Sequence, residues 1–226
     1  MAPELSVRGL HVLIDPGRVP TSRLDGFLGD IAEAGARVVQ VRVKGATDAD
    51  GLAYTERAVA RVRALGLVSI VNDRVDWALA AGADGVHLGQ DDTPLAEARR
   101  GAPDFILGAS AGTLQELEVA YQSGADYVGI GPVYATPSKP DAGSPLTPAG
   151  LRALVTWLEN QPNPPSAVAI GGILPDNAAT VWHTGVAGLA VIQAVCGAPD
   201  PKAAVRALLA ARSAYPDVGA GSHGRY

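Results

Sequence analysis

Basic and amide side chains alternate along one apolar segment, a pattern that could bind an anion. Gln40, Arg42 and Lys44 are two residues apart, and a longer Pro- and Gly-rich segment at 131–148 adds Lys139. Side chains two apart on a strand point to the same side, so the first three would converge on one ligand. Clustered cations repel unless an anion neutralises them, so the bases favour a ligand such as a diphosphate. The alternative is that each is a solvated surface charge.

Two carboxylates, Asp73 and Asp92, follow neighbouring apolar segments and could share a hard cation. Magnesium is usually held by one or two carboxylates, water and substrate phosphates. Each acid also has a structural interpretation. Asp73 could cap a helix ahead of VDWALA, and Asp92 could cap one beginning near Thr93 and Pro94. The pair together with the bases favours a metal and a polyphosphate, because both neutralise the charge that develops on a diphosphate leaving group.

A recurring sequence pattern predicts the fold that would position these residues. A small residue and a glycine precede the apolar runs at 38–41, 85–88, 127–130 and 187–191, and glycine suits a left-handed helix cap. Further apolar runs lie at 9–14, 67–71, 105–110 and 167–172, with amphipathic stretches such as 24–34 and 114–122 between strands. Eight strands alternating with helices predict an α/β fold, a (β/α)8 TIM barrel. A doubly wound open sheet is the alternative.

In such a barrel the chemistry lies at the carboxyl ends of the strands, where Asn72, Ser110 and the paired glycines Gly171 and Gly172 also fall. The glycine turn, with a helix expected from Pro175, could bind a phosphate through backbone amides, although a plain tight turn explains it as well. His11 and His87 lie within strands and are interpreted as histidines of the barrel interior. Cys196 has no base partner that the sequence identifies.

Length and composition bound the remaining choices. The chain has 226 residues, 47% of them hydrophobic, and a net charge of −5, which fits one barrel over 1–226 with a flexible tail at 216–226. Residues 131–148 are predicted to be the loop after the sixth strand, acting as a lid. The acidic balance argues against nucleic acid. No signal peptide or membrane-spanning run is apparent, so the prediction is a cytoplasmic protein with no membrane partner.

Six segments occur in the order found in one enzyme family: QVRVK at 40–44, VNDR at 71–74, GADGVHLGQDD at 82–92, GAS at 108–110, GPVYATPSKP at 131–140 and AIGGI at 169–173. Over about residues 9–196 the chain resembles the thiamine phosphate synthase family. The resemblance implies a transferase with two small-molecule substrates, a pyrimidine diphosphate and a thiazole phosphate. It implies Mg²⁺ as cofactor and thiamine monophosphate and pyrophosphate as products.

The resemblance also implies a role for each matching residue. The pyrimidine diphosphate would contact Gln40, Arg42, Lys44, Asn72, Ser110 and Lys139, of which Arg42, Lys44, Lys139 and Ser110 would be catalytic. Asp73 and Asp92 would bind Mg²⁺. The thiazole phosphate would contact Thr136, Ser138, Gly172 and the backbone near Ile192 and Gln193. In the family the pyrimidine C–O bond breaks first, and the thiazole nitrogen attacks the resulting carbocation without a protein nucleophile.

Two positions depart from the family pattern. Gln193 stands where the family usually has serine, and Gly112 stands where a histidine is expected, which predicts a looser loop after Ser110. A thiazole tautomerase and a non-catalytic barrel that binds a phosphate ligand are the competing functions. Pyrophosphate release separates them from the synthase. The sequence leaves open whether the chain forms a homo-oligomer.

Overall fold

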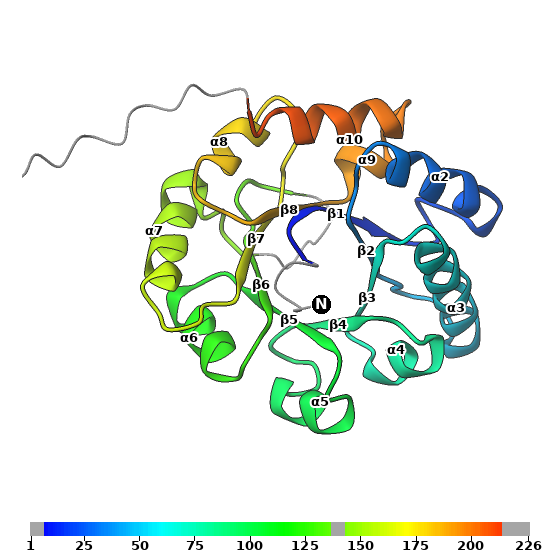
Figure 1. Cartoon of the computed structure of the whole chain (residues 1–226), viewed down its shortest axis with the longest axis horizontal. Helices are drawn as coiled ribbons and strands as arrows, with labels where there is room; N and C mark the ends of the chain where they lie inside the picture. Colours follow the sequence, from blue (N-terminus) through cyan, green and yellow to red (C-terminus); the bar gives the residue numbers. More distant parts are fainter. Residues whose placement is uncertain (1–6, 137–142, 214–226) are drawn as a thin grey trace, which may run out of the picture.

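The computed structural model describes residues 7–136 and 143–213, in which parallel strands close into a barrel surrounded by helices (Figure 1). The strands are β1 Gly9–Ile14, β2 Val38–Val41, β3 Val68–Asn72, β4 Gly85–Leu88, β5 Ile106–Ala111, β6 Tyr127–Ile130, β7 Ser166–Ile170 and β8 Gly188–Val191. The helices are α2 Thr21–Glu33, α3 Asp48–Ala64, α4 Val75–Ala81, α5 Leu95–Gly101, α6 Leu114–Gln122, α7 Thr147–Glu159, α8 Ala178–Trp182, α9 Gln193–Cys196 and α10 Pro201–Ala210. β8 pairs with β1, which confirms the barrel and excludes the open sheet.

The glycines predicted to end helices do adopt left-handed backbone. Positive φ angles occur at each of them: Gly35, Gly82, Gly124 and Gly185. At Gly82, with φ 63° and ψ 41°, the cap N–H donates to carbonyls of the last turn of α4 before β4 begins. The predicted strand bounds agree within one residue except at the end of β7. That strand stops at Ile170, because Gly171 and Gly172 have φ angles of 102° and 65°, which a strand does not contain.

The core has two layers, and the strands alternate between them. In β1, Leu10, Val12 and Ile14 pack outward with Leu28 of α2 in the larger cluster, whereas Leu13 belongs to the smaller one. That smaller cluster combines side chains from across the barrel and so fills its interior: Val7, Leu13, Val38, Ile70, Ile106, Tyr127, Val168 and Ala190. Because alternate side chains face inward, each strand offers few positions at which a polar group can reach the middle of the barrel.

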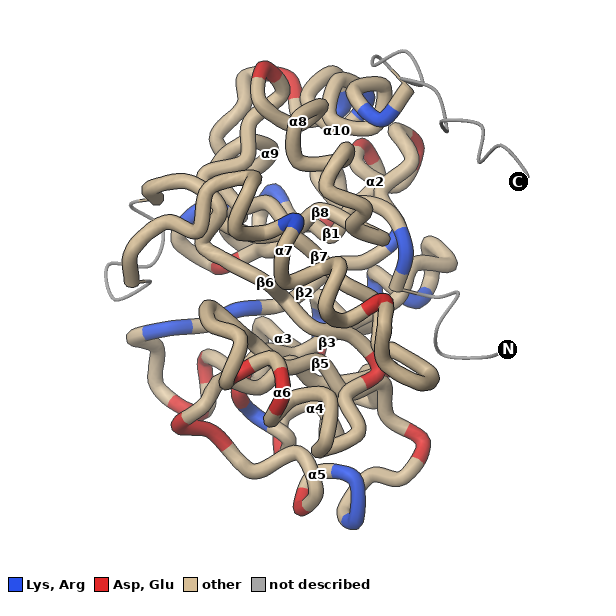
Figure 2. Tube along the Cα trace, turned by 90° about the vertical axis from the view of Figure 1, so that its left-hand side faces the viewer, with Lys and Arg blue, Asp and Glu red and all other residues tan. Residues whose placement is uncertain are grey.

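Charged residues lie mainly on the helices and loops around the barrel, where Figure 2 shows acidic and basic residues interspersed. Within the two described ranges, none of the helices combines the length and apolarity needed to cross a bilayer. Ser138, Lys139 and the predicted tail at 216–226 lie outside the described residues.

The ends of β3 and α3 are braced by the first turn of α4. The Arg74 guanidinium lies 4.2 Å from the centre of the Trp77 ring and pairs with Asp48 of α3 at 2.9 Å. The Trp77 ring, 7% exposed, occupies the space where a Cβ on Gly51 of α3 would be. The absence of a side chain at Gly51 therefore allows α4 to pack closely against α3.

We expect Gly51→Ala to lower the free energy of unfolding by about 1–3 kcal/mol, because the added methyl overlaps the Trp77 ring. Gly26→Ala is the matched control. Gly26 also lies within a helix, α2, but a Cβ there has no neighbour within 4 Å. It should raise the free energy of unfolding by about 0.5–1 kcal/mol through helix propensity alone. Denaturant titrations measure both, and equal effects of the two substitutions would contradict the packing of Trp77 on α3.

Candidate active site

A cavity of about 670 Å³ opens among the loops that follow the strands, at the carboxyl end of the barrel. Its floor includes His11, Gln40, His87 and Tyr127 from the strands, and its rim includes backbone from the loops after β5, β6, β7 and β8. Several residues predicted for the site line this cavity: Gln40, Ser110, Thr136, Gly172, Ile192 and Gln193. The structure therefore brings together residues that lie up to 153 positions apart, from Gln40 to Gln193, at the end where barrel chemistry occurs.

A second group of predicted residues lies beside the cavity rather than in its wall, at the ends of β2, β3 and β4. Of the described residues, this group consists of Arg42, Lys44, Asn72, Asp73 and Asp92. The Arg42 backbone N–H donates to the Ile14 carbonyl at 2.8 Å just after β2 ends. The Lys44 ammonium donates to the Asp73 carboxylate, which is 20% exposed. Lys44, one of the predicted bases, is thus in direct contact with Asp73, one of the two predicted metal ligands.

Neither aspartate caps a helix, so both structural interpretations from the sequence are wrong. The N-cap of α4 is Arg74, and that of α5 is Pro94, and neither has a side-chain cap bond. Asp73 instead has φ 66°, a left-handed conformation that aspartate tolerates better than most residues, and its N–H donates to the His87 carbonyl at 2.8 Å. The Asp92 carboxylate accepts from the Gly89 N–H at 2.7 Å. Both acids are held by β4 and the turn after it.

The two carboxylates interact with each other. Burial raises the pKa of the Asp92 carboxyl, and the neighbouring Asp73 carboxylate raises it further, while the Gly89 N–H and Lys44 act in the opposite direction. Two acids in this relation favour a bound cation, because a cation neutralises their mutual repulsion. No set of three or more His, Cys, Asp or Glu side chains in the described ranges could hold a metal. A two-carboxylate edge completed by water and substrate phosphates fits magnesium rather than zinc.

The turn at Gly171 and Gly172 is packed against the loop that follows β6. A Cβ on Gly171 would lie 2.6 Å from Cα of Pro132, and one on Gly172 would lie 2.7 Å from the Ala135 carbonyl oxygen. The Tyr134 N–H donates to the Gly171 carbonyl at 3.1 Å. Glycine is therefore required here by close backbone approach as well as by positive φ.

The helix expected from Pro175 begins later. α8 starts at Ala178, after a turn in which the Leu174 N–H donates to the Asn177 side chain at 2.9 Å. The Asn177 amide also donates to the Gly172 carbonyl at 3.0 Å. The turn is thus held from the far side by Asn177, and its backbone at Gly172 faces the cavity.

The loop after Ser110 is fixed, contrary to the looser loop expected from Gly112. The Glu116 carboxylate accepts from the Gly112 N–H at 2.6 Å and from the Thr113 N–H at 3.0 Å, and Thr113 completes a capping box at the start of α6. A Cβ on Gly112 would lie 3.1 Å from the Gly131 carbonyl oxygen, so little room is left for a side chain. Backbone bonds to Glu116 hold this loop in the absence of the expected histidine.

Two buried groups that could have been catalytic, His11 and Cys196, have pKa values that keep them neutral. Burial lowers the pKa of His11 to about 4, and its Nε2 lies 2.6 Å from the Val7 carbonyl oxygen, as expected of an interior histidine. Burial raises the pKa of the Cys196 thiol to about 12, and its Sγ donates to the Leu13 carbonyl at 3.2 Å. Cys196 is therefore a neutral thiol and a poor nucleophile.

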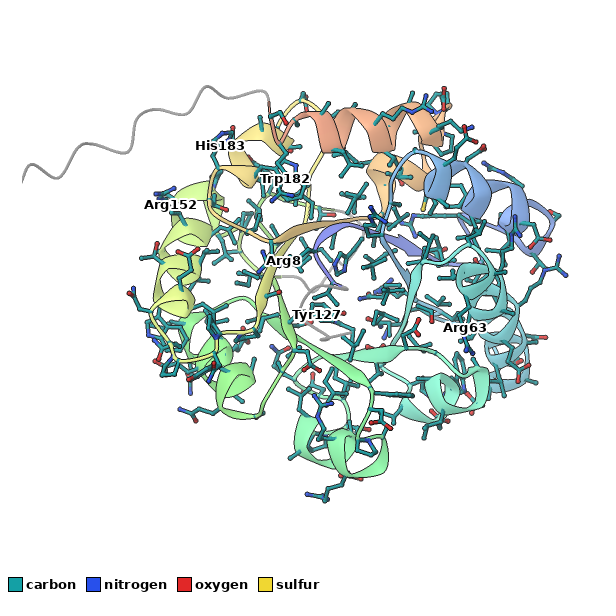
Figure 3. The ribbon with its side chains drawn as sticks, viewed as in Figure 1. Arg8, Arg63, Tyr127, Arg152, Trp182 and His183 are labelled. Carbon is teal, nitrogen blue, oxygen red and sulfur yellow. The ribbon has the colours of Figure 1, made fainter. Side chains whose placement is uncertain are left out.

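Sequence reasoning missed the polar groups that surround Ser110. The ring of His87, interpreted only as an interior histidine, lines the cavity and lies 2.9 Å from Ser110 Oγ. Tyr127, whose side chain lies inside the ring of strands (Figure 3), contacts the other ring nitrogen at 3.0 Å. The Gln90 amide donates to the Ser110 carbonyl at 2.9 Å. A hydroxyl in the otherwise apolar run YVGI was the available signal for Tyr127.

Comparison with known proteins agrees with this geometry. Residues 10–195 match the family model described as thiamine monophosphate synthase. The chain is 45% identical over 204 residues to a thiamine-phosphate synthase of Anaeromyxobacter dehalogenans, covering 90% of this chain and 87% of that protein. It is 48% identical over 211 residues to the thiamine biosynthesis bifunctional protein ThiM/ThiE of Symbiobacterium thermophilum, covering 92% of this chain but 42% of that longer protein.

Solved structures give the same result. Thiamine phosphate pyrophosphorylase from Pyrococcus furiosus superimposes with a TM-score of 0.80 at 36% identity, covering 92% of this chain and 96% of the other. A tryptophan synthase chain of Mycobacterium tuberculosis, 15% identical with a TM-score of 0.66, shares the fold alone. The family match over most of the chain and the relatives above 40% identity agree with the six motifs, five of which supply residues of the cavity wall. The chain therefore belongs to the thiamine monophosphate synthase family and is a transferase of the thiamine-phosphate synthase type.

Proposed function

We propose that the cavity and the adjoining acidic edge are where this chain condenses 4-amino-5-hydroxymethyl-2-methylpyrimidine diphosphate with hydroxyethylthiazole phosphate. The products are thiamine monophosphate and pyrophosphate. The observation that carries the proposal is that a charged surface lies next to a cavity lined by uncharged groups. Lys44, Asp73 and Asp92 form a charged edge, and it borders a cavity whose wall includes Gln40 and Ser110. A substrate with an aromatic ring and a diphosphate needs both surfaces side by side.

The diphosphate is assigned to the charged edge. Arg42 and Lys44 follow β2, Asn72 ends β3, and Ser110 lies near the end of β5 in the cavity wall. Lys139 is assigned to the same group from its place in the family motif. These groups lie where negative charge grows as the pyrimidine C–O bond breaks, and donors already in position stabilise such charge without reorganising.

Asp73 and Asp92 would hold Mg²⁺, with the diphosphate oxygens and water as the other ligands. When bound, the cation supplies charge neutralisation for the leaving diphosphate. Lys44 donates to Asp73 and so holds the orientation of that carboxylate. The overall charge of −5 repels anionic substrates, which makes this local set of positive charges necessary.

The thiazole phosphate is assigned to the opposite rim. Thr136, Gly172, Ile192 and Gln193 line the cavity there, and Ser138 is added from the family motif. Barrels commonly bind a phosphate with the loops after strands seven and eight, which in this chain are the loops after β7 and β8. The long Gln193 side chain lies across Gly197, in space that any larger residue at 197 would occupy. We therefore assign the phosphate contact at Gln193 to its backbone.

The reaction needs no protein nucleophile. Both electrons of the C–O bond leave with the diphosphate, the pyrimidine methylene becomes a carbocation, and the thiazole ring nitrogen forms the new C–N bond. The cavity wall positions the two rings beside each other, which favours attack by the thiazole nitrogen over attack by water. Cytoplasmic location stays a prediction from the sequence.

The first experiment measures pyrophosphate release with both substrates and Mg²⁺. We expect one pyrophosphate per thiamine monophosphate formed, and none when the thiazole phosphate, the pyrimidine diphosphate or Mg²⁺ is omitted. A thiazole tautomerase or a non-catalytic phosphate-binding barrel releases no pyrophosphate under any of these conditions. Loss of the thiazole substrate alone, without pyrophosphate, would refute the proposed function.

The metal assignment is tested with Asp92→Asn, which keeps an oxygen for the Gly89 N–H but removes the charge. We expect the Mg²⁺ concentration for half-maximal activity to rise by about tenfold or more, since ligand charge sets affinity for hard cations. Asp91→Asn is the matched control, because Asp91 is an exposed neighbour of the same charge. Mn²⁺ binding followed by paramagnetic resonance reads the site without turnover. Equal metal affinity in both variants would remove Asp92 from the site.

The base assignment is tested with Lys44→Gln. Removing a charge-assisted donor that acts on the leaving group should cost about 2–4 kcal/mol, or about 30- to 900-fold in turnover. Arg57→Gln is the control, because it breaks another exposed ion pair, with Asp25 at 2.8 Å, on the outer helices. Thr136→Val should instead raise mainly the KM for the thiazole phosphate, whose charge does not change in the reaction. Single-turnover rates at saturating substrates separate the two effects, and the reverse pattern would exchange the two phosphate sites.

A further inference from the structure

A line of buried polar side chains crosses the barrel interior and ends at Ser110. Tyr127 of β6, 1% exposed, has its hydroxyl 3.0 Å from His87 Nδ1, and His87 Nε2 lies 2.9 Å from Ser110 Oγ. Three strands, β6, β4 and β5, each contribute one member. Buried polar groups in the interior of a barrel must satisfy one another, so the arrangement is tightly constrained.

Glycines on β5 and β6 leave space for these two rings. A Cβ on Gly108 of β5 would overlap the Tyr127 ring, and one on Gly129 of β6 would lie 3.1 Å from His87 Cε1. The rings of His87 and Tyr127 are 5.4 Å apart, centre to centre, and tilted by 33°. Two glycines thus make room for two polar rings in a layer that could otherwise hold aliphatic side chains. Packing the barrel interior alone does not require that exchange.

If the His87 imidazole is neutral, the hydrogen bonds along this line can be donated in only two directions. In one, Tyr127 donates to His87 Nδ1, and His87 Nε2–H donates to Ser110 Oγ. In the other, Ser110 donates to Nε2, and Nδ1–H donates to Tyr127. The first leaves the Ser110 proton for a ligand in the cavity, whereas the second leaves Ser110 only as an acceptor.

The ligand expected at Ser110 selects the first direction. A diphosphate oxygen has no proton to donate, so Ser110 can bind it only as a donor. That requires the proton on His87 Nε2, and His87 Nδ1 then accepts from the Tyr127 hydroxyl.

We propose that Tyr127 and His87 form a one-way hydrogen-bond chain that holds the Ser110 hydroxyl as a donor to the substrate diphosphate. Tyr127 and His87 are positioning residues that act through Ser110. This inference rests on the proposed function, because the anionic acceptor sets the direction of the chain. An anionic oxygen accepts hydrogen bonds and cannot donate them, so a serine fixed as a donor matches a diphosphate, and its proton needs no reorientation when charge develops.

The direction is read directly by nitrogen NMR of the full-length protein with ¹⁵N-labelled histidine. Spectra are recorded without substrate at about two pH units above the ordinary pKa of imidazole. We expect His87 to show a protonated Nε2 and an unprotonated Nδ1, with the His87→Gln variant identifying the signals. Tyr127→Phe should shift His87 toward a mixture of tautomers. A protonated Nδ1 in the parent protein, alone or in a doubly protonated ring, would overturn the proposal.

A double-mutant cycle tests whether Tyr127 acts through Ser110. Tyr127→Phe should lower kcat/KM for the pyrimidine diphosphate by about tenfold, the scale of one or two kcal/mol for a hydrogen bond to a charged ligand. In a Ser110→Ala background the same change should cost less than about twofold, because no hydroxyl remains to be oriented. A tenfold loss in both backgrounds would show that Tyr127 acts by packing and would reject the chain.

Tyr54→Phe is the matched control for loss of a buried hydroxyl. Tyr54 is 5% exposed, and its hydroxyl donates to the Val19 carbonyl at 2.7 Å outside the barrel interior. It should lower the thermal midpoint about as much as Tyr127→Phe and leave kcat/KM and the His87 spectrum unchanged. If the parent protein shows no pyrophosphate release, the proposed function fails, yet the histidine spectrum still decides the direction of the chain.

Discussion

The parallel hydrogen bonding of β4 to β3 and β5 is the contact on which the site depends. Its register places His87 beside Asn72 on one side and Gly108 on the other. From that position the His87 carbonyl holds Asp73, while its ring contacts Ser110. One residue thus connects the acidic edge to the cavity wall. A slip of one residue along β4 would turn the His87 ring toward the helices and separate the two halves.

Electrostatic balance shapes the acidic edge. Asp73 and Asp92 would repel each other if both were ionised without a cation, and Lys44 offsets only part of that repulsion. Such an arrangement costs stability in the absence of ligands and strengthens ligand binding, because a cation and a diphosphate supply the missing charges of each sign. Under the proposed function, the same edge would let a chain of net charge −5 bind anionic substrates, because the attraction is local and directional.

Close backbone approach shapes the rest of the cavity. The loop after β6 rests on the Gly171–Gly172 turn, and Asn177 supports that turn from behind. In the barrel interior, Gly108 and Gly129 admit the rings of Tyr127 and His87. Because a Cβ at these positions would meet backbone or a packed ring, the cavity floor and rim have little freedom to adjust. Rigid walls of this kind suit a reaction that must hold two rings in line while a bond breaks.

The fold could be predicted from the sequence because its signals are local. The glycine caps such as Gly82 and the apolar runs such as 85–88 each depend on a few neighbouring residues, and they recur at the spacing of a barrel. The residues that line the cavity, among them Gln40, Ser110 and Gly172, were also found, since strand ends in a barrel converge at one face.

Only the tertiary structure decided what these side chains contact. Taken by itself, the sequence around Asp73 favoured a helix cap, and it gave no sign of the contact with Lys44. That contact spans 29 residues and depends on how β2 and β3 pair. Tyr127 and His87 are 40 residues apart, and each looks like an ordinary strand residue until the barrel closes around both. Glu116 fixes the loop at Gly112 through backbone amides, which carry no sequence signal of their own. Local patterns determine where strands and turns lie, whereas hydrogen bonds between distant residues exist only after the chain has closed on itself.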